Sequence, residues 1–103
     1  MIPCLSDLAW VNWGPYWHPT EPYIIWAGAD HSQPGRPNYD LWLTRYEVKD
    51  GKFTHGPIMR VTDNPAADVL PVFSPDGTQL MWTSNRTDDH ESQLFIADFA
   101  LPK

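Results

Sequence analysis

Short runs of apolar residues separated by turn residues predict that this chain is built of β-strands. In its second half, residues 70–74, 79–84 and 93–99 are rich in apolar side chains. The turn Pro75-Asp76-Gly77 separates the first two runs, and a polar loop over 85–91 separates the last two. Asp-Gly between apolar runs is typical of a tight hairpin, because glycine adopts a positive φ without steric cost. The pattern therefore predicts strand, turn, strand, loop and strand.

The same pattern occurs twice along the chain. Residues 5–30 align without a gap with residues 61–86, at the offset of 56 residues that separates Trp26 from Trp82. Residues 39–44 align with residues 92–97 at an offset of 53. The identical positions are those that shape strands and turns, namely Asp7 with Asp63, Pro15 with Pro71, Pro19 with Pro75 and Trp26 with Trp82. Two copies of one strand unit therefore account for nearly the entire chain.

The strands are apolar at almost every position, as in residues 23–27 and 94–97. Such strands are covered on both faces, and sheets stacked face to face provide that cover. We therefore expect the large aromatic side chains of the strands to pack between sheets; these are Trp17, Phe73, Trp26, Trp82, Trp42 and Phe95. The first copy also supplies a fourth strand over 57–62, reached through a turn at 49–52, and the second copy supplies none.

Composition narrows the class of protein. The chain has 103 residues, which fits one domain, and a net charge of −6, which argues against nucleic acid or an anionic membrane as a partner. No run approaches the roughly 20 apolar residues of a membrane span, and the first residues lack the pattern of a signal peptide. Cys4 is the only cysteine, so neither an internal disulfide nor a cysteine-rich zinc site is expected. The sequence specifies no compartment.

A family resemblance follows from the second copy. Residues 71–86 and 93–98, with the core Phe73-Ser74-Pro75-Asp76-Gly77, resemble the WD-like repeat of TolB-type β-propellers. Residues 15–42 look like a degenerate copy that lacks the serine and the Asp-Gly. The resemblance implies an all-β fold of two four-stranded antiparallel propeller blades, in a family that commonly closes six blades into a ring. It also implies a family that is often periplasmic.

Two blades cannot close a ring, so we expect the chain to complete a six-bladed propeller by homo-oligomerisation. Residues 1–8 would form a closing strand on the last blade of a neighbouring chain, residues 9–62 blade one, and residues 63–103 blade two without its outer strand. A homotrimer gives six blades and a homotetramer gives eight. The other interpretation is that the sequence is a fragment of a larger TolB-like periplasmic propeller protein.

Polar and aromatic residues gather in loops that a propeller places on one face. The candidate ligand- or partner-binding residues are Trp10, Trp13, Asn12, Asp68, Arg36 and Arg86. Trp10 and Trp13 form either a binding platform or a contact across a subunit boundary. Asp68 and Asn12 would lie near the ring axis, where repeated carboxylates suit a cation; alternatively, Asp68 accepts hydrogen bonds from nearby backbone amides.

Motifs for catalysis are not found. The sequence has no nucleophile elbow, phosphate loop, metalloprotease helix or paired-carboxylate motif, and residues 87–91 lack the spacing of metal ligands. His18 replaces the serine of the motif and is expected to be a hydrogen-bonded structural residue. We therefore predict a non-catalytic structural or protein-interaction module, without cofactor or metal, whose loop face binds a peptide or protein. The alternative is a ligand or cation site on the propeller axis.

Overall fold

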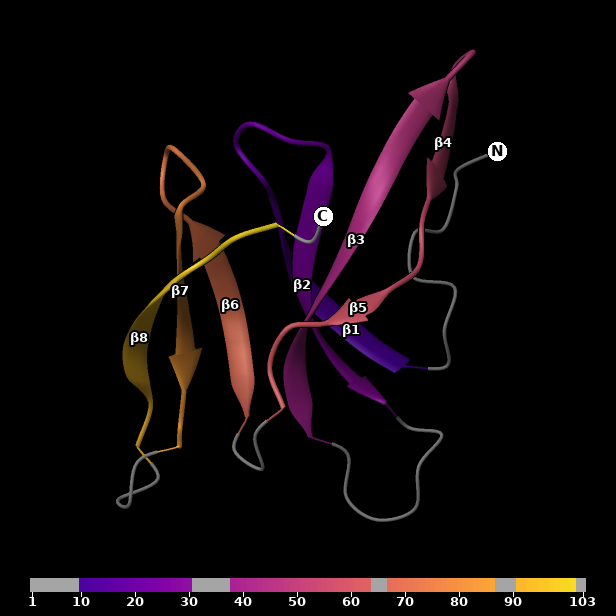
Figure 1. The fold of residues 1–103 in the computed structure, drawn as a ribbon. Helices are drawn as coiled ribbons and strands as arrows, with labels where there is room; N and C mark the ends of the chain where they lie inside the picture. The colour runs from indigo at the N-terminus through magenta and orange to yellow at the C-terminus, as the bar shows by residue number, and fades with distance from the viewer. Residues whose placement is uncertain (1–9, 31–37, 64–66, 87–90, 102–103) are drawn as a thin grey trace.

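The described part of the chain consists entirely of strands, turns and loops. The computed structural model describes residues 10–30, 38–63, 67–86 and 91–101. These residues form eight strands and no helix, and the strands make two antiparallel sheets (Figure 1). The predicted all-β class is confirmed. Within these ranges, no helix that is long and apolar enough to cross a membrane is found.

The first sheet is a meander with a divided outer edge. Its strands are β1 (Trp10–Trp17), β2 (Tyr23–Asp30), β3 (Tyr39–Lys49), β4 (Lys52–His55) and β5 (Met59–Arg60). β4 folds back on the far half of β3 through a two-residue turn in which Asp50 and Gly51 both have positive φ. β5 pairs with the first half of β3, at Trp42 and Leu43. The fourth strand predicted over 57–62 is therefore present but shorter, and the hairpin strand β4 precedes it.

The second sheet has three strands in sequence order. They are β6 (Asp68–Phe73), β7 (Gln79–Ser84) and β8 (Gln93–Asp98). β7 has the predicted bounds, β8 ends one residue before the predicted end, and β6 starts two residues before the predicted start. Gly77 has a φ of 75° in the turn between β6 and β7, as the Asp-Gly pattern predicts.

The two sheets share one irregularity, which supports the alignment of the two copies. The register of the first strand against the second shifts between Trp13 and Tyr16 in one sheet and between Val69 and Val72 in the other. At the equivalent positions within these bulges, Gly14 has a φ of 66° and Leu70 a φ of 55°. A left-handed conformation costs a leucine roughly 1–2 kcal/mol, which the surrounding fold must offset.

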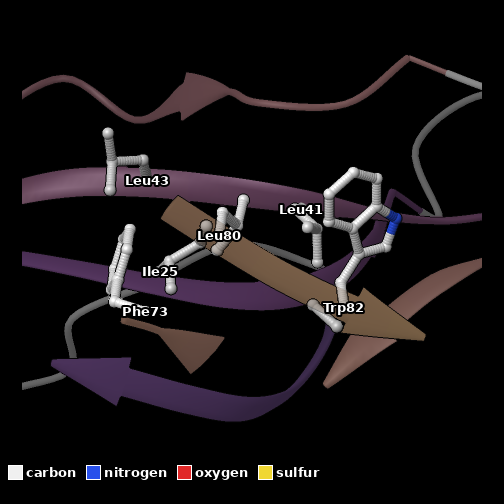
Figure 2. Close-up of a cluster of buried hydrophobic side chains, with 7 residues drawn as sticks. Ile25, Leu41, Leu43, Phe73, Leu80 and Trp82 are labelled. Carbon is white, nitrogen blue, oxygen red and sulfur yellow. The ribbon is translucent and has the colours of Figure 1, made fainter. Parts of the chain in front are cut away.

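The core lies between the two sheets. The first sheet contributes Ile25, Ala27, Leu41 and Leu43, and the second contributes Phe73, Leu80 and Trp82 (Figure 2). Residues paired across antiparallel strands share a face, and neighbours along a strand alternate between faces. The pairs of Trp26 with Trp42 and of Trp17 with Ile24 therefore lie on the outer face of the first sheet. The expected packing between sheets is found for Phe73 and Trp82, and for Phe95, which packs against this core beside Trp82. It is not found for Trp17, Trp26 and Trp42, which face away from the second sheet.

Candidate functional site

A buried carboxylate lies at the start of the second sheet. Asp68 is the first residue of β6 and is fully buried. Its Oδ1 accepts hydrogen bonds from the Trp82 indole at 3.2 Å and from the Arg86 guanidinium at 2.8 Å. Its Oδ2 has no hydrogen-bond partner among the described residues. Burying an unpaired charge is costly. The hydrogen bonds from Arg86 and Trp82 offset the cost of burying this carboxylate.

The Arg86 side chain closes over the carboxylate and the aromatic rings beside it. Its Nε donates to the Ser84 hydroxyl at 3.1 Å. Its guanidinium carbon lies 5.4 Å from the centre of the Trp82 ring and 5.2 Å from that of Phe95, which is the range of cation–π contacts. Among the described residues, Asp68 therefore accepts hydrogen bonds from an indole and a guanidinium and not from backbone amides. A cation at this carboxylate would have to compete with Arg86.

The first sheet repeats this arrangement without the charge. Asn12 Oδ1 accepts a hydrogen bond from the Trp26 indole at 2.9 Å, and both this bond and the one between Trp82 and Asp68 join residues 14 apart. In each sheet, a polar residue of the first strand holds the tryptophan of the second strand. The structure thus gives Asn12 and Asp68 a positioning role.

A second ion pair, in which only the aspartate is buried, holds the edge of the first sheet and was not predicted from the sequence. The Arg60 guanidinium pairs with the buried Asp40 carboxylate and lies 5.2 Å from the centre of the Trp42 ring. The Thr62 hydroxyl donates to Asp40 Oδ1 at 3.3 Å. An aspartate within the apolar run 39–43 was the available signal, because a buried carboxylate requires a partner.

The platform predicted for Trp10 and Trp13 is not tested by the described residues. Trp13 lies beside Asn12 on β1, and the two side chains point to opposite faces of the first sheet. Trp13 packs edge-to-face on Tyr39, with ring centroids 5.9 Å apart, and remains partly exposed. The backbone of Trp10 belongs to β1, but its side chain lies outside the described residues, as does the whole of Arg36.

The turn of the Phe73-Ser74-Pro75-Asp76-Gly77 motif is organised by its aspartate. Asp76 Oδ1 accepts hydrogen bonds from the Thr78 backbone N–H at 3.0 Å and from the Ser74 and Thr78 hydroxyls at 2.8 Å each. The Thr78 N–H, followed by the Ser74 hydroxyl, favours the charged form and lowers the pKa of Asp76 from 3.8 to about 2. The turn therefore carries a fixed negative charge at neutral pH.

In the first copy, His18 takes the place of Ser74. Its Nδ1 accepts the backbone N–H groups of Thr20 at 3.3 Å and of Glu21 at 3.1 Å. An imidazole nitrogen thus fixes a turn that has no Asp-Gly. As expected from the sequence, His18 is a hydrogen-bonded structural residue.

The His18 ring also joins the two turns. It packs edge-on against Phe73, with ring centroids 4.7 Å apart. A Cβ added at Gly77 would lie only 2.5 Å from His18 Cε1. Gly77 is therefore required both for its positive φ and for the space that the imidazole occupies.

Among the described residues, no three His, Cys, Asp or Glu side chains come together in a way that would hold a metal ion. No protein-family model matches the sequence, and no curated protein matches it.

Proposed function

We propose that the chain is a non-catalytic interaction module, formed of two TolB-like propeller blades that join head to tail with further copies of the chain into a closed ring. Three copies give six blades, and four copies give eight. The loop face of the ring then binds a peptide or protein. The support comes from the repeat, because surfaces that are buried in one copy of the strand unit are exposed in the other.

The outward face of the second sheet carries the proposal. Leu94 and Ile96 of β8 are 71% and 63% exposed. At the offset of 53 residues they correspond to Leu41 and Leu43 of β3, which are buried against the second sheet. The same apolar face is thus covered by a sheet in one copy and left open in the other. Exposed apolar surface of this kind marks a contact with a partner.

The outer face of the first sheet offers the matching surface. Trp17 is 58% exposed, whereas its counterpart Phe73 is buried in the core. Each ring packs on an equivalent aromatic neighbour, Trp17 on Tyr46 and Phe73 on Phe99, with centroids 5.1 Å apart in both pairs. A contact between the Trp17 face of one chain and the Leu94 face of the next is heterologous, and such a contact closes a ring when the rotation between subunits divides a full turn.

The free edge of β8 supports a strand contribution from the neighbouring chain. Within the described residues, β8 pairs only with β7, whereas β3 carries β5 along its outer edge. We propose that residues 1–8 of the next copy, which lie outside the described residues, occupy this edge. Main-chain hydrogen bonds would then add to the apolar contact.

The mass of the protein in solution tests the proposal. Light scattering is expected to give the mass of three chains for the wild type. It should give single chains for Leu94→Glu, which places a charge in the contact, and for a chain without residues 1–6. Ser92→Glu, with the same charge just outside β8, should keep the wild-type mass. A wild type that stays a single chain at micromolar concentration would refute the ring and favour a piece of a longer propeller.

A further inference from the structure

A groove lies beside the end of β1, where the hairpin turns 18–22 and 74–78 meet. Both turns are at the upper end of the view in Figure 1. Asp68 and Arg86 lie at the other end of the second sheet. The groove has a volume of about 470 Å³ and is lined mainly by three aromatic and three proline side chains, which are Tyr16, Trp17, Phe73, Pro15, Pro19 and Pro75. Sites for small ligands and peptide segments have this size and this apolar lining.

The aromatic rings of the groove are held in place before any ligand arrives. Phe73 is buried and packs against Tyr16, with ring centroids 6.3 Å apart at an interplanar angle of 49°. Trp17 rests on the edge of Tyr46. Since these contacts restrict the side chains in the free protein, a ligand would order few of them on binding.

Two residues that line the groove have unused polar groups: an indole N–H, which can only donate, and a phenol hydroxyl, which can donate or accept. The indole N–H of Trp17 and the hydroxyl of Tyr16 make no hydrogen bond to any described residue. The Ser74 hydroxyl is already engaged, because it donates to Asp76 and accepts the backbone N–H of Gln79. A ligand that matches this arrangement presents carbonyl acceptors. Proline-rich segments do so, because proline has no N–H and the polyproline II helix leaves every carbonyl free.

The two turns beside the groove carry negative charge. The turns 18–22 and 74–78 hold the carboxylates of Glu21 and Asp76 and no lysine or arginine, whereas the exposed Arg45 of β3 is the strand partner of Tyr23, just after the first turn. The hydrogen bonds to Asp76 hold its pKa at about 2, so it stays ionised at neutral pH. A basic side chain beside the apolar part of a ligand would therefore be attracted to either turn.

From these observations we propose that the groove binds a proline-rich peptide segment in the polyproline II conformation, with a basic residue next to the prolines. The exposed rings of Tyr16 and Trp17 stack on the proline rings, as in other grooves that recognise this conformation. The Trp17 indole and the Tyr16 hydroxyl donate to peptide carbonyls. The carboxylates of the two turns attract the basic residue.

The experiment is a calorimetric titration with a synthetic oligoproline peptide that has an arginine at each end. Trp17 also belongs to the face that the proposed ring would cover, so the titration uses the Leu94→Glu protein, and its mass is measured in parallel. Leu94 lies on the other sheet and does not line the groove. Peptide binding is thereby tested whether or not the wild type forms a ring.

We expect saturable binding that Trp17→Ala weakens at least about tenfold, since tryptophans at the centre of a contact supply much of its affinity. Tyr16→Phe, which removes only the hydroxyl, should weaken binding several-fold. Val48→Ala, at an exposed position of β3 outside the groove, is the control and should bind as before. The proposal is overturned if the peptide does not bind at millimolar concentration. Equal binding of a peptide with alanines in place of the prolines would overturn it too.

Discussion

Replacing Gly77 by alanine tests how the two hairpin turns fit together. Two costs are expected, and the structure separates them. Gly77 has a φ of 75°, where an L-residue costs roughly 1–2 kcal/mol. The new Cβ would also lie 2.5 Å from His18 Cε1. Overpacking of this kind costs about 1–3 kcal/mol, so Gly77→Ala should lower the free energy of unfolding by about 2–5 kcal/mol.

The chain supplies a matched control for the first of these costs. Gly51 has nearly the same φ, 76°, but a Cβ there would meet nothing within 4 Å. Gly51→Ala should therefore cost only the roughly 1–2 kcal/mol of the backbone conformation. The difference between the two variants measures the contact with His18.

The assay is urea denaturation followed by tryptophan fluorescence, at one fixed protein concentration because assembly would also affect the midpoint. A double-mutant cycle completes it. His18→Ser introduces the residue that the second copy has at the equivalent position, Ser74, and makes room for the new methyl group. In that background, Gly77→Ala should lower the free energy of unfolding no more than Gly51→Ala does. If Gly77→Ala and Gly51→Ala lower the free energy of unfolding of the wild type by amounts that agree to within about 0.5 kcal/mol, the inferred close contact of His18 with Gly77 is refuted.

Two further predictions concern the aspartates. Asp68→Asn keeps an acceptor for the Trp82 indole, as Asn12 does in the first sheet, so it should destabilise the protein less than Asp68→Ala, by about 1 kcal/mol in denaturation. An Asp68→Asn variant as unstable as Asp68→Ala would show that Arg86, not the indole, is the partner that matters. Since the pKa of Asp76 is lowered from 3.8 to about 2, the stability it contributes is present above about pH 4 and is lost as the pH falls through about 2. The stability difference between wild type and Asp76→Asn should shrink over that range, and a difference independent of pH would contradict the lowered pKa.

Features set by local chemistry were predictable from the sequence. The apolar run of β7 lies between turn and loop residues, and its bounds were predicted without error. The positive φ of Gly77 followed from Asp-Gly. The left-handed Leu70 was not predictable, because no property of leucine favours that conformation. Only its alignment with Gly14 indicates that a bulge recurs there.

Features that depend on distant partners were predicted in part. Asp68 and Arg86 were both selected as candidate residues, but their pairing with each other was not foreseen. The ion pair of Asp40 with Arg60 was missed because 20 residues separate them, and only the folding back of β5 onto β3 brings them together. β4 was missed because its four residues are mostly polar and exposed, which gives no apolar pattern to recognise.

The two sheets have no strand in common, and the chain passes between them once, from β5 to β6. A circularly permuted gene that starts in this crossing and joins residue 103 to residue 1 would leave both meanders unbroken. In the proposed ring, residues 1–8 could then reach the edge of β8 in their own chain, and neighbouring subunits would meet through side chains alone. The order of strands along the chain, not their number, would thus decide whether the subunits exchange a strand or only touch.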